Sequence, residues 1–274
     1  MNRPKGKIVV LVVAIIVVFA LNFPVYWMFV QSITSESMFT ERPSLLPKAP
    51  SFDAFRRICE AKPMGQWFVN TLIVAVGTVV LSMPLAAGAA FSLSRYKTTL
   101  NSITGLAILG TQMLSASLLA IPIYVLFRRT GLHDKLGGLI VANTAFTLPM
   151  SIWVLKGFFD AIPKELDEAA MIDGCSVGQM IWKVIMPLVL PGIVAVSIFA
   201  FILAWDEFFF ARTLVTSQGN WVMSVGLSSF REEFTIQWSD MMAAAVLFTI
   251  PPIVLFMFIQ KHLVSGLTGG AVKG

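Results

Sequence analysis

The chain has 274 residues and a formal net charge of +5; 57% of its residues are hydrophobic and only 13% are charged. Soluble domains carry about 25% charged residues. Together with a mean hydropathy of +0.80, this composition excludes an ordinary soluble domain and indicates a single integral membrane domain. The basic residues are scattered rather than massed in one patch, which argues against nucleic acid as a partner.

The N-terminus must be assigned either to a signal peptide or to a first membrane span. Three basic residues precede an apolar run, 8–21, and the apolar character resumes through 23–30. A signal peptide has an apolar region of about 7–15 residues, and this stretch is longer. A membrane helix can absorb Pro24 within it. We therefore expect an uncleaved first span.

Six stretches have the roughly 20 apolar residues that a membrane helix requires, so the sequence predicts an all-α membrane protein. The small residues at 86–90 in the second stretch would allow neighbouring helices to approach closely. The predicted spans are Ile8–Val30, Trp67–Leu93, Ile103–Phe127, Gly138–Phe159, Leu188–Ala211 and Asp240–His262.

The charge rule for membrane orientation does not decide the topology. With the N-terminus inside, the 20 lysines and arginines divide equally between the two sides of the membrane. The first helix usually dominates orientation, and Arg3, Lys5 and Lys7 precede it. We therefore expect both termini, the 263–274 tail and the 160–187 connection to be cytoplasmic.

The 160–187 connection is charged and contains signals for two short helices. Pro163 suits a first helical position and Gly174 the left-handed position just past a helix end. Acidic residues favoured by the helix dipole gather near the start of this first helix: Glu165, Asp167 and Glu168. Ala169 and Ala170 would leave a smooth surface that another protein could approach.

A second helix should follow directly. Ser176 and Gln179 have the spacing of a capping box, and an apolar stripe extends from Val177 towards the fifth span. Pro187 and Pro191 mark the expected junction between this helix and the fifth span. These local signals leave open an amphipathic interfacial loop without any partner.

The same residues carry a resemblance to a known family. Glu168-Ala169-Ala170, three residues, Gly174, nine residues and Val184-Ile185-Met186-Pro187 are similar to the EAA loop of ABC importer permeases, E-A-A-x3-G-x9-I-x-L-P. Valine and methionine replace the isoleucine and leucine of that pattern. The flanking PKELDEAAMIDG, AWDEFFFA at 204–211 and the tail from residue 260 resemble the carbohydrate-uptake, MalG-like branch.

The resemblance implies a type I importer permease with a MetI-like fold in the bacterial cytoplasmic (inner) membrane. The EAA loop would form a coupling helix docked in a cleft of an ATPase subunit. The docking contacts would come from Glu168, Ala169, Ala170, Asp173 and Gly174, with a further contact from the 265–274 tail. ATP-driven closure of the ATPase pair would rock the permease between inward-facing and outward-facing states.

The resemblance also implies the rest of the assembly. Six spans would form half of a pathway, so a second permease subunit, two ATPase subunits and an external solute-binding protein are expected. The chain has no G-x-x-x-x-G-K-[ST] phosphate loop. We therefore expect no catalytic residues and no cofactor in this chain, with ATP and magnesium held by the ATPase subunits.

Asp206 and Glu207 lie in the predicted fifth span, where carboxylates are costly and usually face a cavity or a partner. They could line a pore or gate for a sugar, with Trp205 and Phe209 beside them; they could equally be structural, or lie at the watery end of the span. The resembling family more often has asparagine at position 206. Gln112 and Asn143 are further pathway candidates, although such residues more often form helix–helix hydrogen bonds.

Other chemistry has little support in the sequence. His133 and His262 lack metal-ligand spacing, and Cys59 and Cys175 are expected on opposite sides of the membrane as free thiols. An ion-coupled secondary transporter of a small polar solute would need buried ionisable groups near the midplane, for which Asp206 and Glu207 are weak candidates. An integral-membrane enzyme would need a catalytic set, and the sequence contains none. An ATP-driven, binding-protein-dependent importer of a sugar or sugar derivative is the main hypothesis.

Overall fold

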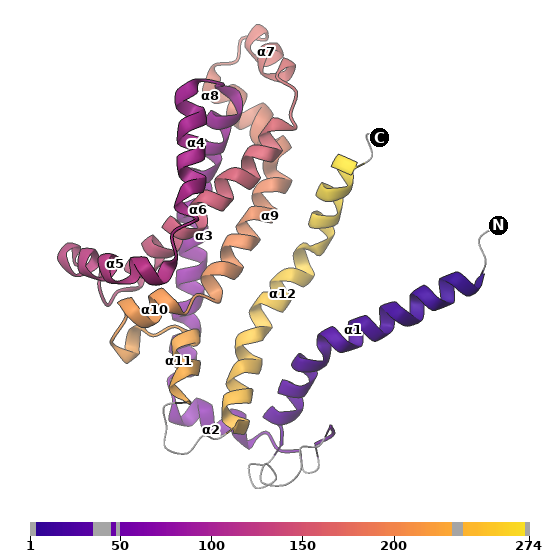
Figure 1. Ribbon diagram of the computed structural model, residues 1–274, viewed down its shortest axis with the longest axis vertical. Coiled ribbons are helices and arrows are strands. Elements are labelled where there is room, and N and C mark those ends of the chain that lie inside the picture. The colour runs from indigo at the N-terminus through magenta and orange to yellow at the C-terminus, as the bar shows by residue number, and fades with distance from the viewer. Residues whose placement is uncertain (1–3, 35–44, 48–49, 232–237, 272–274) are drawn as a thin grey trace. The chain divides into compact units, whose positions relative to one another are not determined.

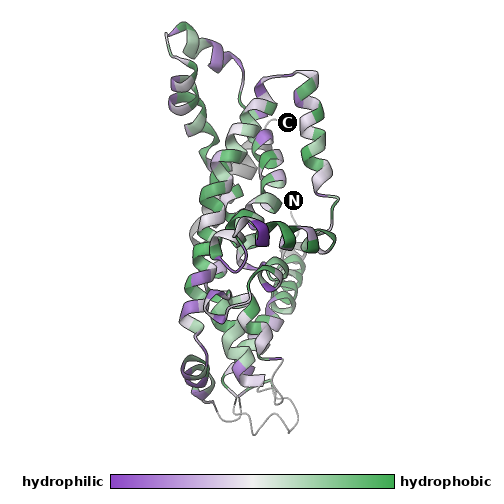
Figure 2. Cartoon of the chain, turned by 90° about the vertical axis from the view of Figure 1, so that its left-hand side faces the viewer, coloured by the Kyte–Doolittle hydropathy of each residue, from purple (hydrophilic) through white to green (hydrophobic). Residues whose placement is uncertain are grey.

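The computed structural model describes residues 4–34, 45–47, 50–231 and 238–271, and the regular elements in these ranges are helices (Figure 1). In this part of the chain five helices are long and apolar enough to cross a membrane, or six if one bent pair forms a single span. Hydrophobic residues dominate the long helices (Figure 2). The predicted all-α membrane fold is therefore confirmed.

The chain forms two compact units. The first contains Met1–Gln66 and Gly226–Pro251. It includes α1 (Pro4–Ser32), α2 (Asp53–Ala61) and the start of α12 (Trp238–Ala271). Arg57 of α2 forms an ion pair with Asp240 of α12, with Nη2 and Oδ1 2.6 Å apart. This contact joins two elements that are far apart in sequence.

The second unit contains Trp67–Val225 and Pro252–Gly274. Most of its helices follow one another directly. They are α3 (Met64–Arg95), α4 (Thr99–Thr111), α5 (Ala116–Thr130), α6 (Leu136–Asp160), α7 (Glu165–Ile172), α8 (Val177–Gln179), the π-helix η2 (Met180–Ile185), α9 (Met186–Trp205), α10 (Phe209–Leu214), the 3-10 turn η3 (Gln218–Asn220) and α11 (Met223–Ser229).

The core of the second unit lies where α3, α6 and α9 pack together. Ala86 and Ala90 of α3 are fully buried in it, as expected from the run of small residues, whereas Gly88 faces outward. A Cβ atom on Gly192 of α9 would lie 2.5 Å from the ring of Phe158 in α6. Small residues thus allow the close approach of these three helices.

The third predicted span, Ile103–Phe127, is not a single straight helix. α4 and α5 meet at an angle of 98°, and α5 crosses the direction of α4 (Figure 1). Ser115 adopts an extended backbone conformation at the start of α5, and the Thr111 hydroxyl donates to the Ile108 carbonyl. Polar side chains that compete for backbone groups weaken the helix at this point, which the apolar content of the stretch concealed.

The fifth predicted span, Leu188–Ala211, has different bounds in the structure. A continuous helical stretch runs from Val177 to Trp205 and ends there, before Asp206. Proline has no N–H to donate, and the turn before Pro187 is a π-helix in which Met186 N donates to the Ile181 carbonyl. The wider turn carries the helix through the proline, so the second short helix and the fifth span form one continuous helical stretch.

Candidate functional site

The 160–187 connection forms a short helix, α7, followed by a tight turn. Gly174 has φ +82°, which confirms the predicted left-handed helix end. Cys175 N donates to Ala170 O at 3.0 Å, closing the turn as in a Schellman motif. The predicted capping box is also present, because Ser176 and Gln179 satisfy each other's backbone N–H groups. This turn therefore has a defined geometry rather than that of a loose loop.

The two alanines of the EAA motif have different environments. Ala169 is exposed with Glu168, Asp173 and Gly174, whereas Ala170 is 6% exposed and belongs to the core. The prediction that both alanines form an open surface was wrong for Ala170. Neighbouring residues of a helix point about 100° apart, so α7 can turn Ala170 into the core while Ala169 stays exposed. Ala170 instead anchors α7.

Sequence reasoning missed the apolar part of this surface. Met171 is 55% exposed and Ile172 is 85% exposed, both on α7, and Trp182 just beyond it is 71% exposed. Large apolar groups exposed together on a short polar connection mark a protein or membrane contact. The signal was available in the sequence, because Met171 and Ile172 interrupt an otherwise polar stretch.

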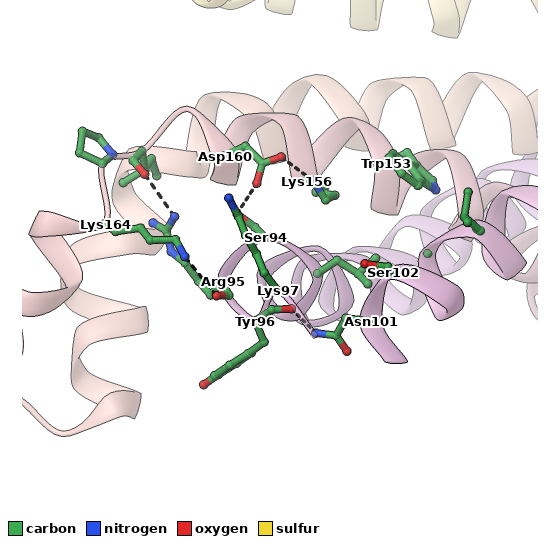
Figure 3. A pocket seen from close by; sticks show the side chains of 15 residues that line it. Ser94, Arg95, Tyr96, Lys97, Asn101, Ser102, Trp153, Lys156, Asp160 and Lys164 are labelled. Carbon is green, nitrogen blue, oxygen red and sulfur yellow. Dashed lines mark hydrogen bonds and ion pairs between the residues drawn. The ribbon is translucent and has the colours of Figure 1, made fainter. Parts of the chain in front are cut away.

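A buried arginine attaches α7 to the ends of α3 and α6. Arg95 Nε lies 2.6 Å from Asp167 Oδ2 of α7, and the two side chains are only 7% and 16% exposed. Arg95 Nη1 donates to the carbonyls of Phe159 and Ile162 at 3.3 and 3.2 Å. Ser94 Oγ donates to Asp160 Oδ1 at 2.6 Å beside it (Figure 3). We call Arg95 and Asp167 the clamp pair.

The carboxylates near the fifth span lie in the break between α9 and α10, not inside a helix. Glu207 accepts the N–H groups of Phe210 at 2.6 Å and Ala211 at 2.9 Å, so it caps α10 and has a structural role. Ser224 Oγ donates to the Glu207 carbonyl at 2.7 Å. Asp206 is exposed, and its carboxylate has no partner within the described ranges.

The aromatic pathway candidates take part in packing. Trp205 is fully buried between Phe201, whose ring centroid is 5.5 Å away, and Phe68, whose centroid is 5.7 Å away. Trp205 therefore presents no open ring face to a sugar, which favours the structural alternative for this residue. Phe209 is 39% exposed and packs edge-on against Phe210.

The polar pathway candidates also have defined positions. Asn143 of α6 is 3% exposed. Gln112 Nε2 donates to the Phe146 carbonyl at 3.4 Å, which is the helix–helix hydrogen bond that such residues usually form. The structure does not gather Gln112, Asn143 and Asp206 into a common hydrogen-bonded cluster, and their pathway roles stay predictions.

The other end of the unit carries a second ordered feature. α6 has 25 residues, so at 1.5 Å per residue it separates the α7 end from this one by about 37 Å. Here Asp134 accepts N–H groups of Thr216 at 3.0 Å and Ser217 at 2.9 Å, and the Ser217 hydroxyl also donates to it. Asn220 Nδ2 donates to the Asp134 carbonyl at 2.7 Å. Partial burial opposes ionisation, but the hydrogen bonds from Ser217 and Thr216 to the carboxylate outweigh it and lower the pKa of Asp134 below its ordinary value.

A metal centre has no support in the described part of the chain, where no three His, Cys, Asp or Glu side chains gather closely enough to hold an ion. One end of the unit carries a short anchored helix, α7, whose exposed surface has polar and apolar residues. At the other end, two loops are joined by hydrogen bonds. Together with the helical fold, these features define a multi-pass helical membrane protein.

The comparisons identify the family. Residues 4–269 match the family described as the binding-protein-dependent transport system inner membrane component. The chain belongs to this family and is therefore a multi-pass membrane subunit of ABC-type transport systems.

Curated relatives cover nearly the whole chain. It is 36% identical to the diacetylchitobiose uptake system permease protein DasC of Streptomyces coelicolor, over 98% of both chains. It is 34% identical to the trehalose transport system permease protein SugB of Mycobacterium tuberculosis, over 92% of both chains. A solved bacterial ABC transporter that imports alginate contains a chain with a TM-score of 0.80 at 24% identity, over 95% of this chain and 98% of that one. This last likeness supports the fold.

Proposed function

We propose that the chain is one membrane subunit of an ATP-driven, binding-protein-dependent importer of a sugar or sugar derivative, working by alternating access. The observation that carries this proposal is the family match over residues 4–269, joined to an α7 that is both anchored and exposed. Relatives named for diacetylchitobiose and trehalose uptake support a carbohydrate cargo.

Energy would enter through α7. Four exposed residues of α7 and the residue after it form a surface that we call the docking face: Glu168, Ala169, Met171, Ile172 and Asp173. An ATPase subunit would bind this face, while Ala170 and the clamp pair connect α7 to the ends of α3 and α6. A stiff connection transmits a rigid-body movement, whereas a flexible loop would absorb it. A second permease subunit and a pair of ATPase subunits complete this arrangement, with ATP and magnesium held by the ATPases.

The two ends of the second unit would face opposite sides of the membrane. If α7 is cytoplasmic, the hydrogen-bonded loops around Asp134 and Ser217 lie on the outer side of the membrane, about 37 Å away along α6. They would meet the solute-binding protein there. The same orientation places both termini in the cytoplasm. A solved alginate transporter with the same fold was crystallised with an oligosaccharide-bound periplasmic protein, which supports such an external partner.

Uptake by the reconstituted complex tests the proposal. The chain, its partner permease and the ATPase subunits would be placed in proteoliposomes with the cognate binding protein and labelled sugar. We expect uptake that requires ATP and persists when a protonophore collapses the ion gradient. Uptake driven by a gradient without ATP would instead support a secondary transporter.

Two variants of one exposed residue test the docking face. Ile172→Asp would place a carboxylate in the docking contact, whereas Ile172→Ala only shortens an apolar side chain. Truncating an interface anchor to alanine costs about 2 kcal/mol or more, so Ile172→Ala should weaken ATPase binding by about 30-fold and Ile172→Asp by at least as much. Because Ile172 is 85% exposed, the stability of the isolated chain should not change. Full ATPase binding by Ile172→Asp would refute the assignment of this face.

A further inference from the structure

A cavity of about 830 Å³ lies beside the clamp pair in the second unit (Figure 3). Its walls come from the last turn of α3 with the residues after it, the start of α4, the last turns of α6, and residues 162–164. Two predicted membrane helices, α3 and α6, end here at Arg95 and Asp160. The cavity therefore lies at the level where these helices leave the hydrocarbon. We call it the basic cavity.

The basic cavity has more positive than negative charge. Its lining includes Arg95, Lys97, Lys156 and Lys164, and Asp160 is the acidic residue among the lining residues. Asp160 Oδ2 is occupied by Lys156 Nζ at 2.5 Å, and Arg95 is neutralised by an aspartate of α7. Two cations are left in excess. Lys164 Nζ donates to a backbone carbonyl, that of Arg95, at 3.3 Å, and Lys97 is exposed.

The basic cavity also has apolar lining residues. They include Leu93, Gly105, Leu106 and Trp153, and Leu106 is 67% exposed. The indole nitrogen of Trp153 is buried without a hydrogen-bond partner in the described part of the chain. Tryptophan prefers the membrane interface, where one part of the ring meets acyl chains and another a polar group. A soluble anion would need only the basic lining residues, whereas a lipid would use the basic and the apolar ones.

We propose that the basic cavity binds the phosphate headgroup of an anionic membrane lipid, with its acyl chains along Leu106 and Trp153. Lys97 and Lys164 supply the excess positive charge, and the Trp153 ring belongs to the apolar part of the lining. Basic pockets between membrane helices bind anionic headgroups by this chemistry. The site's place in the cytoplasmic leaflet rests on the orientation given under the proposed function. A bound lipid would contact the ends of α3 and α6 that hold the clamp pair, and so would bear on the anchoring of α7.

Native mass spectrometry of the whole purified transporter tests this site. The probes are dioleoyl phosphatidylglycerol, dioleoyl phosphatidylcholine and inorganic phosphate. The test variant is Lys97→Gln with Lys164→Gln. The matched control is Arg129→Gln with Lys135→Gln, which removes two exposed cations at the other end of α6.

Wild type and control should bind one phosphatidylglycerol more tightly than phosphatidylcholine. A basic residue near a membrane surface contributes a factor of about five to anionic lipid affinity, so the test variant should lose about 25-fold. Millimolar inorganic phosphate should not displace the lipid.

Several results would overturn the proposal. These are equal affinity for the two lipids, equal losses in the test variant and the control, or displacement of the lipid by inorganic phosphate, which would indicate a soluble anion. Cross-linking of Lys97→Cys to an ATPase subunit, with no lipid bound, would show that a protein covers the cavity. None of these measurements uses ATP or sugar. Failure of ATP-driven uptake with intact lipid selectivity would therefore refute the import proposal alone.

Discussion

Removing the Arg95 side chain tests whether α7 is held rigidly by the clamp pair. Arg95→Met keeps the apolar stem but removes the guanidinium. Asp167 then loses its partner 2.6 Å away, and the Phe159 and Ile162 carbonyls lose their shared donor. The perturbation therefore acts on the attachment of α7 without altering the docking face.

The expected loss of stability follows from the burial of the clamp pair. Removing one partner of a fully buried ion pair costs about 3–5 kcal/mol, and an exposed pair contributes about 0–1 kcal/mol. Side-chain exposures of 7% and 16% place the clamp pair near the buried limit, so we expect a local cost of about 2–3 kcal/mol. Opening of α7 should then become about 30- to 150-fold more frequent.

Hydrogen exchange at α7 and the coupling of transport to ATP hydrolysis measure the effect. Amides of 166–173 should exchange faster by about this factor, and the sugar moved per ATP hydrolysed should fall. Arg56→Met is a matched control, because Arg56 and Glu60 form an ion pair with side chains 78% and 65% exposed. Its effect should stay below about 0.5 kcal/mol.

A double-mutant cycle separates the ion pair from general damage. Arg95→Met, Asp167→Leu and their combination should be non-additive, with the double variant less damaged than the sum of the single variants. Unchanged exchange at α7 in Arg95→Met, or additive effects in the cycle, would refute the reasoning.

Three further predictions concern the two ends of the second unit and the topology. Gly174→Ala should cost about 1–2 kcal/mol because φ is positive, with no clash, since the space around it is open. Gly174→Trp should abolish uptake while the chain stays in the membrane, and normal uptake would refute docking beside this turn. An impermeant thiol reagent added outside should label Cys59 and not Cys175, and the reverse pattern would overturn the orientation. Asp134→Asn should destabilise the outer loops by about 0.5–1 kcal/mol, since the bonds are exposed. Because the folded pKa of Asp134 is lowered, its stabilisation is present above the unfolded pKa of about 3.9 and is lost as pH falls through the folded value. A flat thermal-stability profile from pH 5 to 3 in wild type, equal to that of the variant, would contradict this role.

Local signals in the sequence were sufficient to predict where the helix of the EAA segment ends and where the next helix begins. The capping box at Ser176 and the left-handed Gly174 depend on residues within four positions of one another, so their geometry follows from short-range chemistry. The long apolar stretches likewise predicted membrane helices, because span length reflects bilayer thickness. The family pattern rests on the same local spacing.

Tertiary structure decided which of these residues face a partner. Ala169 and Ala170 have the same side chain, yet packing against the core buries one and exposes the other. Glu207 was a pathway candidate by hydropathy, but the break after α9 turns its carboxylate onto the N–H groups of α10. Hydropathy averages over a window and cannot detect such a break.

Contacts between residues far apart in the chain also could not be predicted from the sequence. Arg95 and Asp167 are 72 positions apart, and no periodicity relates them. Asp134 and Ser217 are 83 positions apart, joined only because the helices between them return the chain to the same end. The sequence by itself determined that the chain is a bundle of membrane helices and where the α7 segment ends, through apolar length, helix propensity and capping. The folded chain decided how that segment is anchored, because an ion pair forms only where packing brings its two charges together and excludes water.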